Sequence, residues 1–332
     1  MVKRVAILGG GQWGRTIGLL LAQKPLDIVI WDNRISLKDE LPMFYEVMGV
    51  VGHSIVHEPY LETDLSQALN NTELIIIALP SDAVRDVVKQ VSVHDIQNCP
   101  VIAATKGFDE YKGEIRMMME IVGEGLGKKT NIGILSGPNL SKEIQARHPA
   151  VTLIASKSKE LIDIGMNLLA SKLFRIYGSH DVIGVQVGGA VKNVIALAGG
   201  MVDELGFQYN TKAALLTRGL AEITRLGTKL GGERETFAGI SGLGDLICTA
   251  FSPSSRNYRA GRMFAKGLKR ERIEYEIGEV IEGINASRIV MKLAERENVE
   301  MPISDGVYKV VWDGIDPVKV IEELMMREMK FE

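Results

Sequence analysis

Cysteine is scarce in this chain of 332 residues, in which only Cys99 and Cys248 occur. So few cysteines exclude a disulfide-scaffold protein and are typical of a reducing compartment. An excess of charge is also lacking, because 39 basic and 42 acidic residues leave a formal net charge of −3. Proteins that coat phosphate backbones are usually basic, so we expect no nucleic-acid partner. We interpret the one basic stretch, from Arg256 to Arg272, as a solvated surface.

Export and membrane signals are lacking as well. The apolar start of the chain ends in three glycines, residues 9–11, without the small-residue cleavage site of a signal peptide. Residues 182–202 reach the length of a membrane span, about 20 residues. Lys192 lies at the middle of this stretch, where a charge in lipid is costly, so we expect a buried helix instead. These absences predict a cytoplasmic protein with no membrane partner.

The composition that remains is ordinary for a folded globular protein, with 46% hydrophobic and 24% charged residues. The length suggests two domains, at about 150 residues per domain. Glycine is the exception, because its 35 residues exceed the usual share of about 7%. Several of these glycines fall in short motifs between predicted strands and helices.

The first half of the chain alternates short apolar runs with helical patterns. We predict strands at residues 4–8, 27–31, 74–79, 101–104, 132–135, 151–155 and 174–176. Helical spacing covers residues 12–23, and Ser81 predicts an N-cap for a helix over residues 82–90. This alternation is typical of a parallel sheet that helices cover on both faces.

The second half contains no comparable series of strands. We predict helices at residues 182–205, 211–230, 257–266, 284–297, 304–311 and 317–326. The fold class is therefore α/β, with a Rossmann-type parallel sheet over residues 1–180 and an all-helical domain over residues 181–332. The helical domain also offers a surface for a homodimer, which the pattern alone leaves open.

A glycine-rich turn follows the first predicted strand and has the spacing G-x-G-x-x-G at Gly9, Gly11 and Gly14. The first glycine permits a tight turn, the second lets a pyrophosphate approach, and the third lets helix and strand pack closely. The pyrophosphate sits at the helix N-terminus, where N–H groups and the helix dipole favour an anion. This context indicates an NAD(P) site, and the alternative is a glycine turn in a nucleotide-free α/β protein.

Asp32 ends the second predicted strand, 21 residues beyond Gly11, where an acidic residue can hold an adenosine ribose. Its charge favours NAD by repelling a 2′-phosphate, whereas Asn33 and Arg34 can accept one. The residues therefore leave NAD and NADP both open. A plain surface acid in a turn is the alternative role for Asp32.

Lys192 is the only charged residue of the apolar stretch, and small residues precede it at 188–190. Burial of an unpaired ammonium is expensive and lowers its pKa. Small neighbours leave room for a ligand, so this lysine is a candidate general acid or base. The alternative is a lysine whose charge reaches solvent from a helix end.

Seven short blocks along the chain carry a family resemblance. They are G-G-G-Q-W-G at 9–14, A-T-K-G at 104–107, S-G-P at 136–138, G-V-Q-V-G-G-A-V-K-N at 184–193, L-T-R-G-L-A-E at 216–222, G-L-G-D-L at 242–246 and S-R-N at 255–257. In this order they resemble the NAD(P)-dependent glycerol-3-phosphate dehydrogenases of the bacterial type, over about residues 4–310. The resemblance implies a Rossmann domain followed by a helical domain of the 6-phosphogluconate dehydrogenase-like kind. It also implies reduction of dihydroxyacetone phosphate to sn-glycerol 3-phosphate, the backbone for phospholipid synthesis.

The resemblance further implies roles for individual residues, and Lys192 matches the proton donor and acceptor of the family. Residues that match substrate contacts are Lys106, Gly137, Asn139, Asn193, Asp245, Ser255, Arg256 and Asn257. Residues that match cofactor contacts are Gly9, Gly11, Gln12, Trp13, Gly14, Asp32, Asn33, Arg34, Lys106, Ser141, Arg256, Val280 and Glu282. A cation near Lys192, such as Lys106, would lower the pKa of Lys192 and suit proton exchange near neutrality. Arg256 suits a phosphate because its guanidinium can bind in a bidentate fork.

The chain also departs from the family pattern. The family usually has Ser or another small residue at the position of Gln12, and often Thr-Phe where this chain has Asn139 and Leu140. Asn139 can still donate a hydrogen bond to a substrate. Asp32 is not a fixed feature of the family, which leaves the choice between NAD and NADP open.

No metal site is expected, because His53 and His57 lie in a loop-like segment and no helix pairs histidine with a nearby cysteine. Cys248 is expected to pack in the core. Two other functions remain open. One is another reductase on the same two-domain plan, which would lack the S-R-N segment. The other is a non-catalytic NAD(P)-sensing protein, which has no need for Lys106, Lys192 and Asp245 together.

Overall fold

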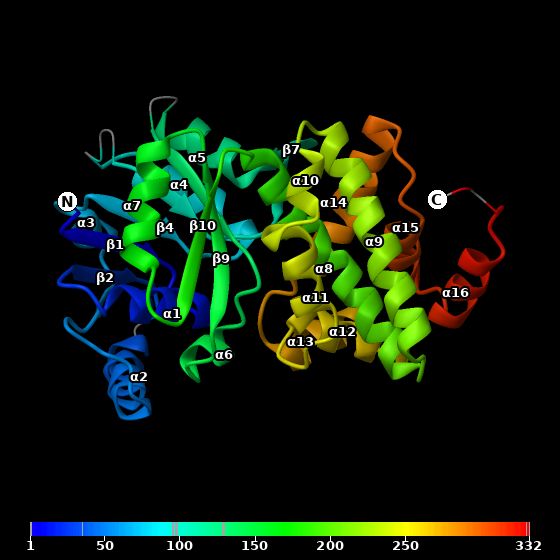
Figure 1. Cartoon of the computed structure of the whole chain (residues 1–332), viewed down its shortest axis with the longest axis horizontal. Coiled ribbons are helices and arrows are strands. Elements are labelled where there is room, and N and C mark those ends of the chain that lie inside the picture. Colours follow the sequence, from blue (N-terminus) through cyan, green and yellow to red (C-terminus); the bar gives the residue numbers. More distant parts are fainter. Residues whose placement is uncertain are drawn as a thin grey trace. The chain divides into compact units, whose positions relative to one another are not determined.

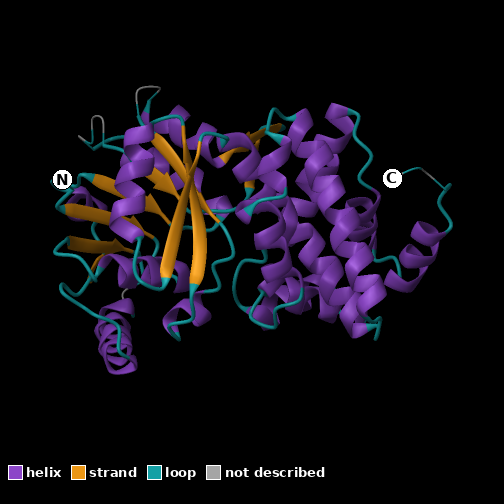
Figure 2. Cartoon of the chain, viewed as in Figure 1, coloured by secondary structure: helices purple, strands orange, loops and turns teal. Residues whose placement is uncertain are grey.

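All strands of the described chain lie before residue 180. The computed structural model describes residues 2–34, 36–94, 96, 99–127, 130–329 and 331, in two compact units, Met1–Val182 and Ile183–Glu332. Strands and helices alternate in the first unit, and the second consists of helices and loops (Figure 2). The strands are β1 (Arg4–Leu8), β2 (Asp27–Trp31), β3 (Tyr60–Glu62), β4 (Leu74–Ile77), β5 (Val101–Ala103), β6 (Phe108–Tyr111), β7 (Glu114–Met117), β8 (Ile132–Ser136), β9 (Ala150–Ser156) and β10 (Phe174–Ser179).

Eight of these strands form one sheet in the order β10-β9-β8-β5-β4-β1-β2-β3. Neighbours pair in parallel everywhere except between β8 and β9, which are antiparallel with Ser136 opposite Leu153. Strands β6 and β7 form a separate antiparallel hairpin. The predicted Rossmann-type sheet is thus confirmed, with one correction, since a fully parallel sheet was expected. The carboxyl ends of β1, β2, β4, β5 and β8 lie at one edge.

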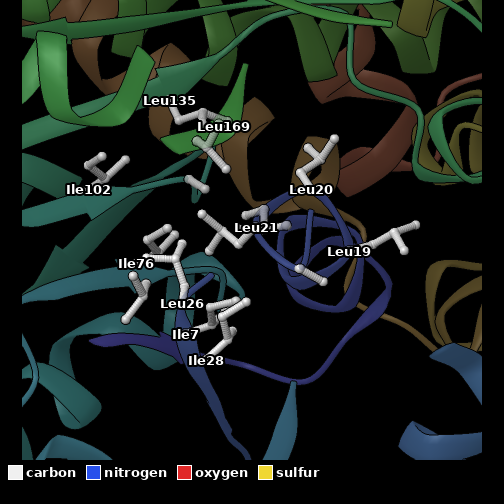
Figure 3. Close-up of a cluster of buried hydrophobic side chains, with 14 of the residues drawn as sticks. Ile7, Leu19, Leu20, Leu21, Leu26, Ile28, Ile76, Ile102, Leu135 and Leu169 are labelled. Carbon is white, nitrogen blue, oxygen red and sulfur yellow. The ribbon is translucent and has the colours of Figure 1, made fainter. Parts of the chain in front are cut away.

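The strands are apolar because helices cover both faces of the sheet. Strand β1 is buried from Val5 to Leu8, and β4 is buried throughout. Figure 3 shows side chains of β1, β2, β4, β5 and β8 packed with leucines of α1. This core fixes the sheet edge on which the glycine-rich turn lies.

The helices of the first unit connect the strands (Figure 1). They are α1 (Gln12–Leu21), α2 (Leu37–Val51), α3 (Leu65–Leu69), α4 (Ser81–Val91), α5 (Met118–Leu126), α6 (Ser141–Gln145) and α7 (Lys159–Leu169). Helix α4 corrects one prediction, because Pro80 is its N-cap and Ser81 is its first helical residue.

The second unit contains helices and two short π-helical segments. They are α8 (Val182–Glu204), α9 (Tyr209–Lys229), α10 (Arg234–Phe237), η1 (Ile240–Gly244), α11 (Asp245–Ala250), α12 (Arg256–Ala265), α13 (Arg270–Ile277), α14 (Glu282–Glu297), α15 (Pro302–Tyr308), η2 (Lys309–Asp313) and α16 (Pro317–Met325). All six predicted helices are present. The expected helix over residues 304–311 is divided between α15 and η2.

Helix α8 is the core of this unit. It is long and apolar enough to cross a membrane, but 94% of its most apolar window is buried inside the protein, as predicted. Its small residues permit close packing, since a Cβ at Gly199 would lie 2.2 Å from the Ala250 carbonyl oxygen. A Cβ at Gly200 would lie 2.0 Å from the Tyr258 carbonyl oxygen. Helices α11 and α12 can therefore approach the backbone of α8 directly.

Candidate active site

The glycine-rich turn lies where the strand order reverses, because β1 pairs with β4 on one side and β2 on the other. Ligands of open α/β sheets bind at such a switch point, outside the carboxyl ends of the strands. Gly9 has a φ of 113° and hydrogen-bonds through its N–H to the Trp31 carbonyl at 2.8 Å. A Cβ at Gly14 would lie 1.8 Å from the Gly9 carbonyl oxygen, so no side chain fits there. Both glycines have the roles that the motif predicts.

The N-terminus of α1 suits an anionic group. Gly11 is the N-cap, no side chain caps the helix, and the first turn carries no acidic residue. A Cβ at Gly11 would meet no other atom within 4 Å, so the space beside this backbone is open. Free N–H groups and the helix dipole attract a phosphate at such an end. These residues therefore fit the pyrophosphate of a dinucleotide.

Asp32 follows β2 and is tied to the glycine turn. Its carboxylate accepts hydrogen bonds from the Gly10 N–H at 2.7 Å, from the Arg34 N–H at 3.0 Å and from the Arg34 guanidinium at 2.8 Å. Burial alone would raise the pKa of Asp32, but these hydrogen bonds lower it below its ordinary value. Asp32 is thus a buried, ionised carboxylate, and the alternative role as an exposed turn acid is wrong.

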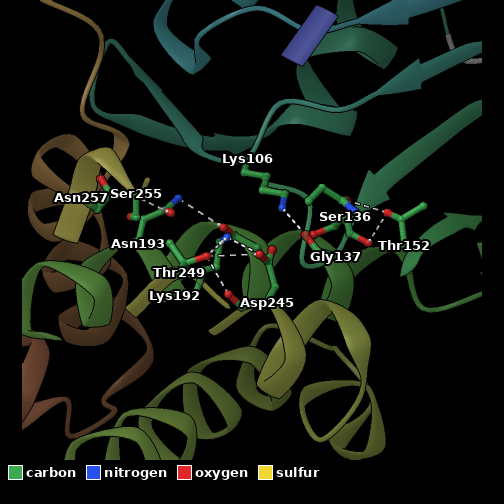
Figure 4. Close-up of polar contacts among 12 residues, drawn as sticks. Lys106, Ser136, Gly137, Thr152, Lys192, Asn193, Asp245, Thr249, Ser255 and Asn257 are labelled. Atoms are coloured by element: carbon green, nitrogen blue, oxygen red, sulfur yellow. Dashed lines mark hydrogen bonds and ion pairs between the residues drawn. The ribbon is translucent and has the colours of Figure 1, made fainter. Parts of the chain in front are cut away.

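Lys106 and Gly137 belong to adjacent strand ends of the first unit. Lys106 follows β5, and its ammonium donates a hydrogen bond to the Gly137 carbonyl at 2.8 Å (Figure 4). Asn139 lies two residues further on and contacts β9, through bonds to the Val151 carbonyl and the Thr152 hydroxyl. Three predicted substrate residues are therefore gathered at this edge of the sheet.

Lys192 is buried at the middle of α8 and forms an ion pair with Asp245 (Figure 4). Its ammonium also donates a hydrogen bond to the Thr249 hydroxyl at 2.7 Å. The Thr249 hydroxyl donates in turn to the Asp245 carbonyl, so it can only accept from Lys192. The side chains of Lys192 and Asp245 are 6% and 2% exposed, which excludes a lysine that reaches solvent.

Asp245 owes its position to an irregular backbone. The π-helical segment η1 runs from Ile240 to Gly244 and leads directly into α11 at Asp245. A Cβ at Gly242 would lie 2.1 Å from the carbonyl oxygen of Phe237, the last residue of α10. Glycine is therefore required where η1 passes α10. Short π-helical segments occur often at functional sites. The G-L-G-D motif is the sequence of this turn.

Two asparagines extend the network toward α12 and α14. The Asn257 amide donates to the side-chain oxygen Oδ1 of Asn193 at 2.9 Å and accepts from the Gly283 N–H at 2.9 Å. Ser255 is the N-cap of α12 and accepts from the Tyr258 N–H. Lys192, Asn193, Asp245 and Asn257 are thus brought together within the helical unit.

Arg256 begins α12 and lies nearer the surface, with its guanidinium 3.2 Å from Glu279. Its side chain is 41% exposed, so it can exchange this partner for a ligand. Val280 is exposed, and Glu282 is the first residue of α14. In the first unit, Gln12 and Asn33 are exposed, Trp13 is half-buried, and Ser141 is the first residue of α6.

The sequence reasoning missed three hydroxyl groups that contact or adjoin predicted site residues. Thr249 lies one helical turn after Asp245, which is the signal that could have identified it. Thr152 has no motif of its own, because its contact depends on the pairing of β8 with β9. Ser136 is part of the S-G-P block, and its buried hydroxyl has no hydrogen-bond partner among the described residues.

The two cysteines differ in burial. Cys99 is buried, and burial raises the pKa of its thiol to about 12. Cys248 is only half-buried, so the expected core position holds in part. In the described ranges, no group of three or more His, Cys, Asp or Glu side chains is arranged to hold a metal ion.

The first unit has a Rossmann-type sheet with a dinucleotide turn, and the second buries a lysine–carboxylate pair. This combination is typical of the two-domain nicotinamide-dependent oxidoreductases. The comparisons with known proteins specify the family. Residues 4–162 match the model of the NAD-dependent glycerol-3-phosphate dehydrogenase N-terminus, and residues 181–322 match that of the C-terminus. The chain therefore belongs to the NAD-dependent glycerol-3-phosphate dehydrogenase family, as the seven blocks predict.

Relatives and solved structures agree with this membership. A glycerol-3-phosphate dehydrogenase of Bacillus licheniformis, named for NAD(P)+, is 39% identical over 330 residues, which cover 98% of this chain and 95% of that protein. Its counterpart in Clostridium tetani is 37% identical over 332 residues, covering 100% and 94%. The crystal structure of glycerol-3-phosphate dehydrogenase from Coxiella burnetii is 31% identical, with a TM-score of 0.87 and coverage of 98% and 99%.

Proposed function

We propose that this chain reduces dihydroxyacetone phosphate to sn-glycerol 3-phosphate, reversibly, with NADH or NADPH. The product is a backbone for phospholipid synthesis. The observation that carries the proposal is the buried contact of Lys192 with Asp245 and Thr249 in a chain of this family. A buried ammonium with a fixed carboxylate partner suits proton transfer and is unnecessary in a protein that only senses NAD(P).

In this proposal one unit binds mainly the dinucleotide and the other mainly the substrate. Residues 1–180 bind the dinucleotide, supported by the open N-terminus of α1 and by the Asp32 contact with Gly10. Residues 181–332 bind the substrate, supported by the polar network of α8, α11 and α12. Gly9, Gly11 and Gly14 hold the pyrophosphate, and the remaining cofactor contacts of the family pattern are Gln12, Trp13, Asn33, Arg34, Lys106, Ser141, Arg256, Val280 and Glu282.

The bound dinucleotide supplies the hydride that reduces the substrate carbonyl carbon. Lys192 Nζ gives a proton to the carbonyl oxygen as that oxygen gains negative charge, and in the reverse direction it takes the proton from the hydroxyl. Asp245 stabilises the ammonium, and Thr249 accepts a second hydrogen from it, so that Nζ stays in one position. No metal ion is needed for this step, because Lys192 neutralises the developing charge.

The substrate phosphate requires cations and N–H donors. Arg256 presents a guanidinium fork at the start of α12, a helix of ten residues whose N-cap is Ser255. The helix dipole at this end also favours an anion. Asn257, the second residue of α12, donates a hydrogen bond to Asn193 of α8. In the family pattern, the residues of the first unit that match substrate contacts are Lys106, Gly137 and Asn139.

The experiment is NADH and NADPH oxidation by the purified chain, followed by the loss of absorbance of the reduced nicotinamide ring. We expect oxidation only when dihydroxyacetone phosphate is added, and no loss of rate with a chelator. A reductase of another substrate class would oxidise NADH with a different carbonyl compound. An NAD(P) sensor would bind the dinucleotide, seen by fluorescence titration, with no turnover at all.

We also infer a cytoplasmic location and the absence of nucleic-acid and membrane partners. The low cysteine content, the net charge of −3 and the burial of α8 support these inferences. A homodimer through the helical unit is the assembly to test, since Val318, Met325 and Met326 of this unit expose apolar side chains. Light scattering of the purified chain distinguishes a dimer from a monomer.

A further inference from the structure

Thr152 is a completely buried hydroxyl at the start of β9. Its Oγ1 lies 2.8 Å from Asn139 Oδ1 and 3.1 Å from the Ser136 carbonyl oxygen (Figure 4). Both partners are acceptors, so the single hydroxyl proton of Thr152 serves the two of them. Ser136 and Asn139 are the first and last residues of the segment that contains Gly137.

The sheet register explains how Thr152 reaches this segment. Strands β8 and β9 are antiparallel, and Ser136 pairs with Leu153. Thr152 precedes Leu153 in β9. Because the strands run in opposite directions, Thr152 lies beside Gly137, where β8 ends. From there its hydroxyl connects both ends of the turn over residues 136–139.

The Asn139 amide has only one orientation that satisfies its neighbours. Nδ2 donates to the Val151 carbonyl at 3.1 Å, and Oδ1 accepts from Thr152. A flipped amide would face the Val151 carbonyl with an acceptor, which is unfavourable. Of the two Nδ2 hydrogens, Val151 takes one, and within the described part of the chain the second has no partner. That second hydrogen can serve a ligand.

The same turn also holds Lys106. Its ammonium donates to the Gly137 carbonyl, which lies between the two partners of Thr152. A turn that is fixed at both ends presents this carbonyl at a constant place. Thr152 thus positions the Asn139 amide and the Gly137 carbonyl, two groups of the proposed substrate site, without belonging to the site itself.

We propose that Thr152 is a positioning residue for substrate binding, which holds Asn139 and the turn over residues 136–139 in the orientation that receives dihydroxyacetone phosphate. This inference rests on the proposed function. Thr152 belongs to none of the seven blocks of the family, and its partner Asn139 stands where the family often has Thr. The contact of Thr152 with Asn139 is therefore one that the motifs alone do not indicate.

The test compares Thr152→Val, which keeps the shape and removes the hydroxyl, with Thr152→Ser, which keeps the hydroxyl. We expect Thr152→Val to raise KM for dihydroxyacetone phosphate about 3- to 10-fold, the equivalent of one hydrogen bond. The kcat and the NADH dissociation constant should change less than about twofold, and Thr152→Ser should restore KM. A lower Tm with unchanged KM would make Thr152 merely structural and overturn the proposal.

A double-mutant cycle identifies the residue through which Thr152 acts. Asn139→Ala should raise KM, and addition of Thr152→Val to Asn139→Ala should raise it little further, because the contact is already lost. If the two substitutions instead raise KM by independent factors that multiply, the positioning role is overturned, while the proposed activity still stands. Absence of any reduction of dihydroxyacetone phosphate by the unmodified chain would instead refute the proposed function.

A third variant keeps the test decisive if Thr152→Val folds poorly. Thr152→Cys keeps a similar volume but offers only a weak S–H donor. The three variants should then rank by donor strength, with KM rising from Ser to Cys to Val. A ranking that follows Tm instead of donor strength would contradict the positioning role.

Discussion

Two of the ion pairs among the candidate site residues have a buried carboxylate, but they differ in sequence separation and in the exposure of the cation. We call Asp32–Arg34, whose arginine is exposed, the exposed pair, and Lys192–Asp245 the buried pair. Asp32 and Arg34 are two residues apart, and their side chains are 9% and 54% exposed. Lys192 and Asp245 are 53 residues apart, and their side chains are 6% and 2% exposed. The first pair is formed by one loop, and the second requires the folded helical unit.

This difference determines what each pair can do. Water and salt screen the Arg34 charge, so this arginine can leave Asp32 and bind a ligand at small cost. In the buried pair, neither charge can leave the other without being stranded in a medium of low dielectric. The exposed pair therefore suits a choice between cofactors, and the buried pair suits a fixed position for a reacting proton.

Replacement of the buried lysine should have the largest effect. We expect Lys192→Ala to lower kcat by about 10² to 10⁴, the range for loss of a general acid. NADH binding, measured by fluorescence titration, should remain nearly unchanged. The matched control is Lys159→Ala, which breaks the exposed pair of α7 with Asp163 and should leave kcat unaltered. Loss of NADH binding together with the rate would indicate a structural lysine.

Replacement of Asp245, the partner of Lys192, should lower both the stability and the rate. Asp245→Asn leaves a buried ammonium without its counter-charge, and removal of one member of such a pair costs about 3–5 kcal/mol. We expect a lower free energy of unfolding in urea and a lower kcat. Equal stability and equal rate would mean that Thr249 alone holds the lysine, and the contrast with the exposed pair would fail.

The sequence predicted Asp32, Arg34 and the glycine turn as cofactor contacts because all of them are local, whereas the ion pair of Asp32 with Arg34 is seen only in the structure. Spacing within some 25 residues of the chain was enough to place Gly9, Gly14 and Asp32 at one sheet edge. The role of Lys192 was open from its residues alone, since its carboxylate partner lies 53 residues further on. Only the family resemblance connected the two, and the ion pair with Asp245 is what the structure adds.

Other features required long-range pairing that no local pattern contains. Strand β9 was expected at residues 151–155, but its antiparallel direction was not. A short buried apolar run has the same sequence pattern in a parallel and in an antiparallel strand. The contact of Thr152 with Asn139 depends on that direction and was missed for the same reason. The hairpin of β6 and β7 was also missed, since its strands alternate weakly and are only partly buried.

Arg256 gives an intermediate case, with a half-exposed guanidinium beside Glu279. We expect Arg256→Lys to raise KM for dihydroxyacetone phosphate about 10-fold, because an ammonium cannot reproduce a bidentate fork on phosphate. The kcat should fall less than KM rises. If KM for the dinucleotide changes and KM for dihydroxyacetone phosphate does not, Arg256 belongs to the cofactor site.

A buried carboxylate that is held by backbone N–H groups and a hydroxyl extends the comparison to pH. Glu222 of α9 accepts from the Ile303 and Ser304 N–H groups and the Ser304 hydroxyl, yet burial raises its pKa above the ordinary value. Between the ordinary and the raised pKa, the folded state therefore holds a proton that the unfolded state has already lost. Stability should fall as pH rises from about the ordinary carboxyl pKa through the raised one.

Glu222→Gln tests this linkage, since an amide does not titrate. Its free energy of unfolding should vary less with pH than that of the unmodified chain, although loss of one acceptor costs on the order of 1 kcal/mol at acidic pH. Urea unfolding at several pH values measures both. Parallel pH profiles for the two proteins would show that Glu222 stays ionised in the folded state.

The smallest effect is expected at the exposed pair, where the choice of cofactor depends on a balance of charges. Asp32 next to an NADP 2′-phosphate would cost on the order of 4 kcal/mol at about 4 Å and a dielectric of about 20, before screening. Arg34 offsets much of this, because its guanidinium already neutralises Asp32 and can turn to the phosphate. Both cofactors should therefore work, with NADH modestly favoured.

Asp32→Ala should raise the ratio of kcat/KM for NADPH to that for NADH about 3- to 10-fold, and Arg34→Ala should lower it, since screened charges contribute about 1 kcal/mol. The ratio is the right measure because Asp32 also accepts from the Gly10 N–H, so its loss loosens the turn for both cofactors equally. An unchanged ratio with two weaker affinities would mean that Asp32 only supports the glycine turn. The pair of Asp32 with Arg34 would then have no part in the choice of cofactor, and the functional contrast with the buried pair would disappear.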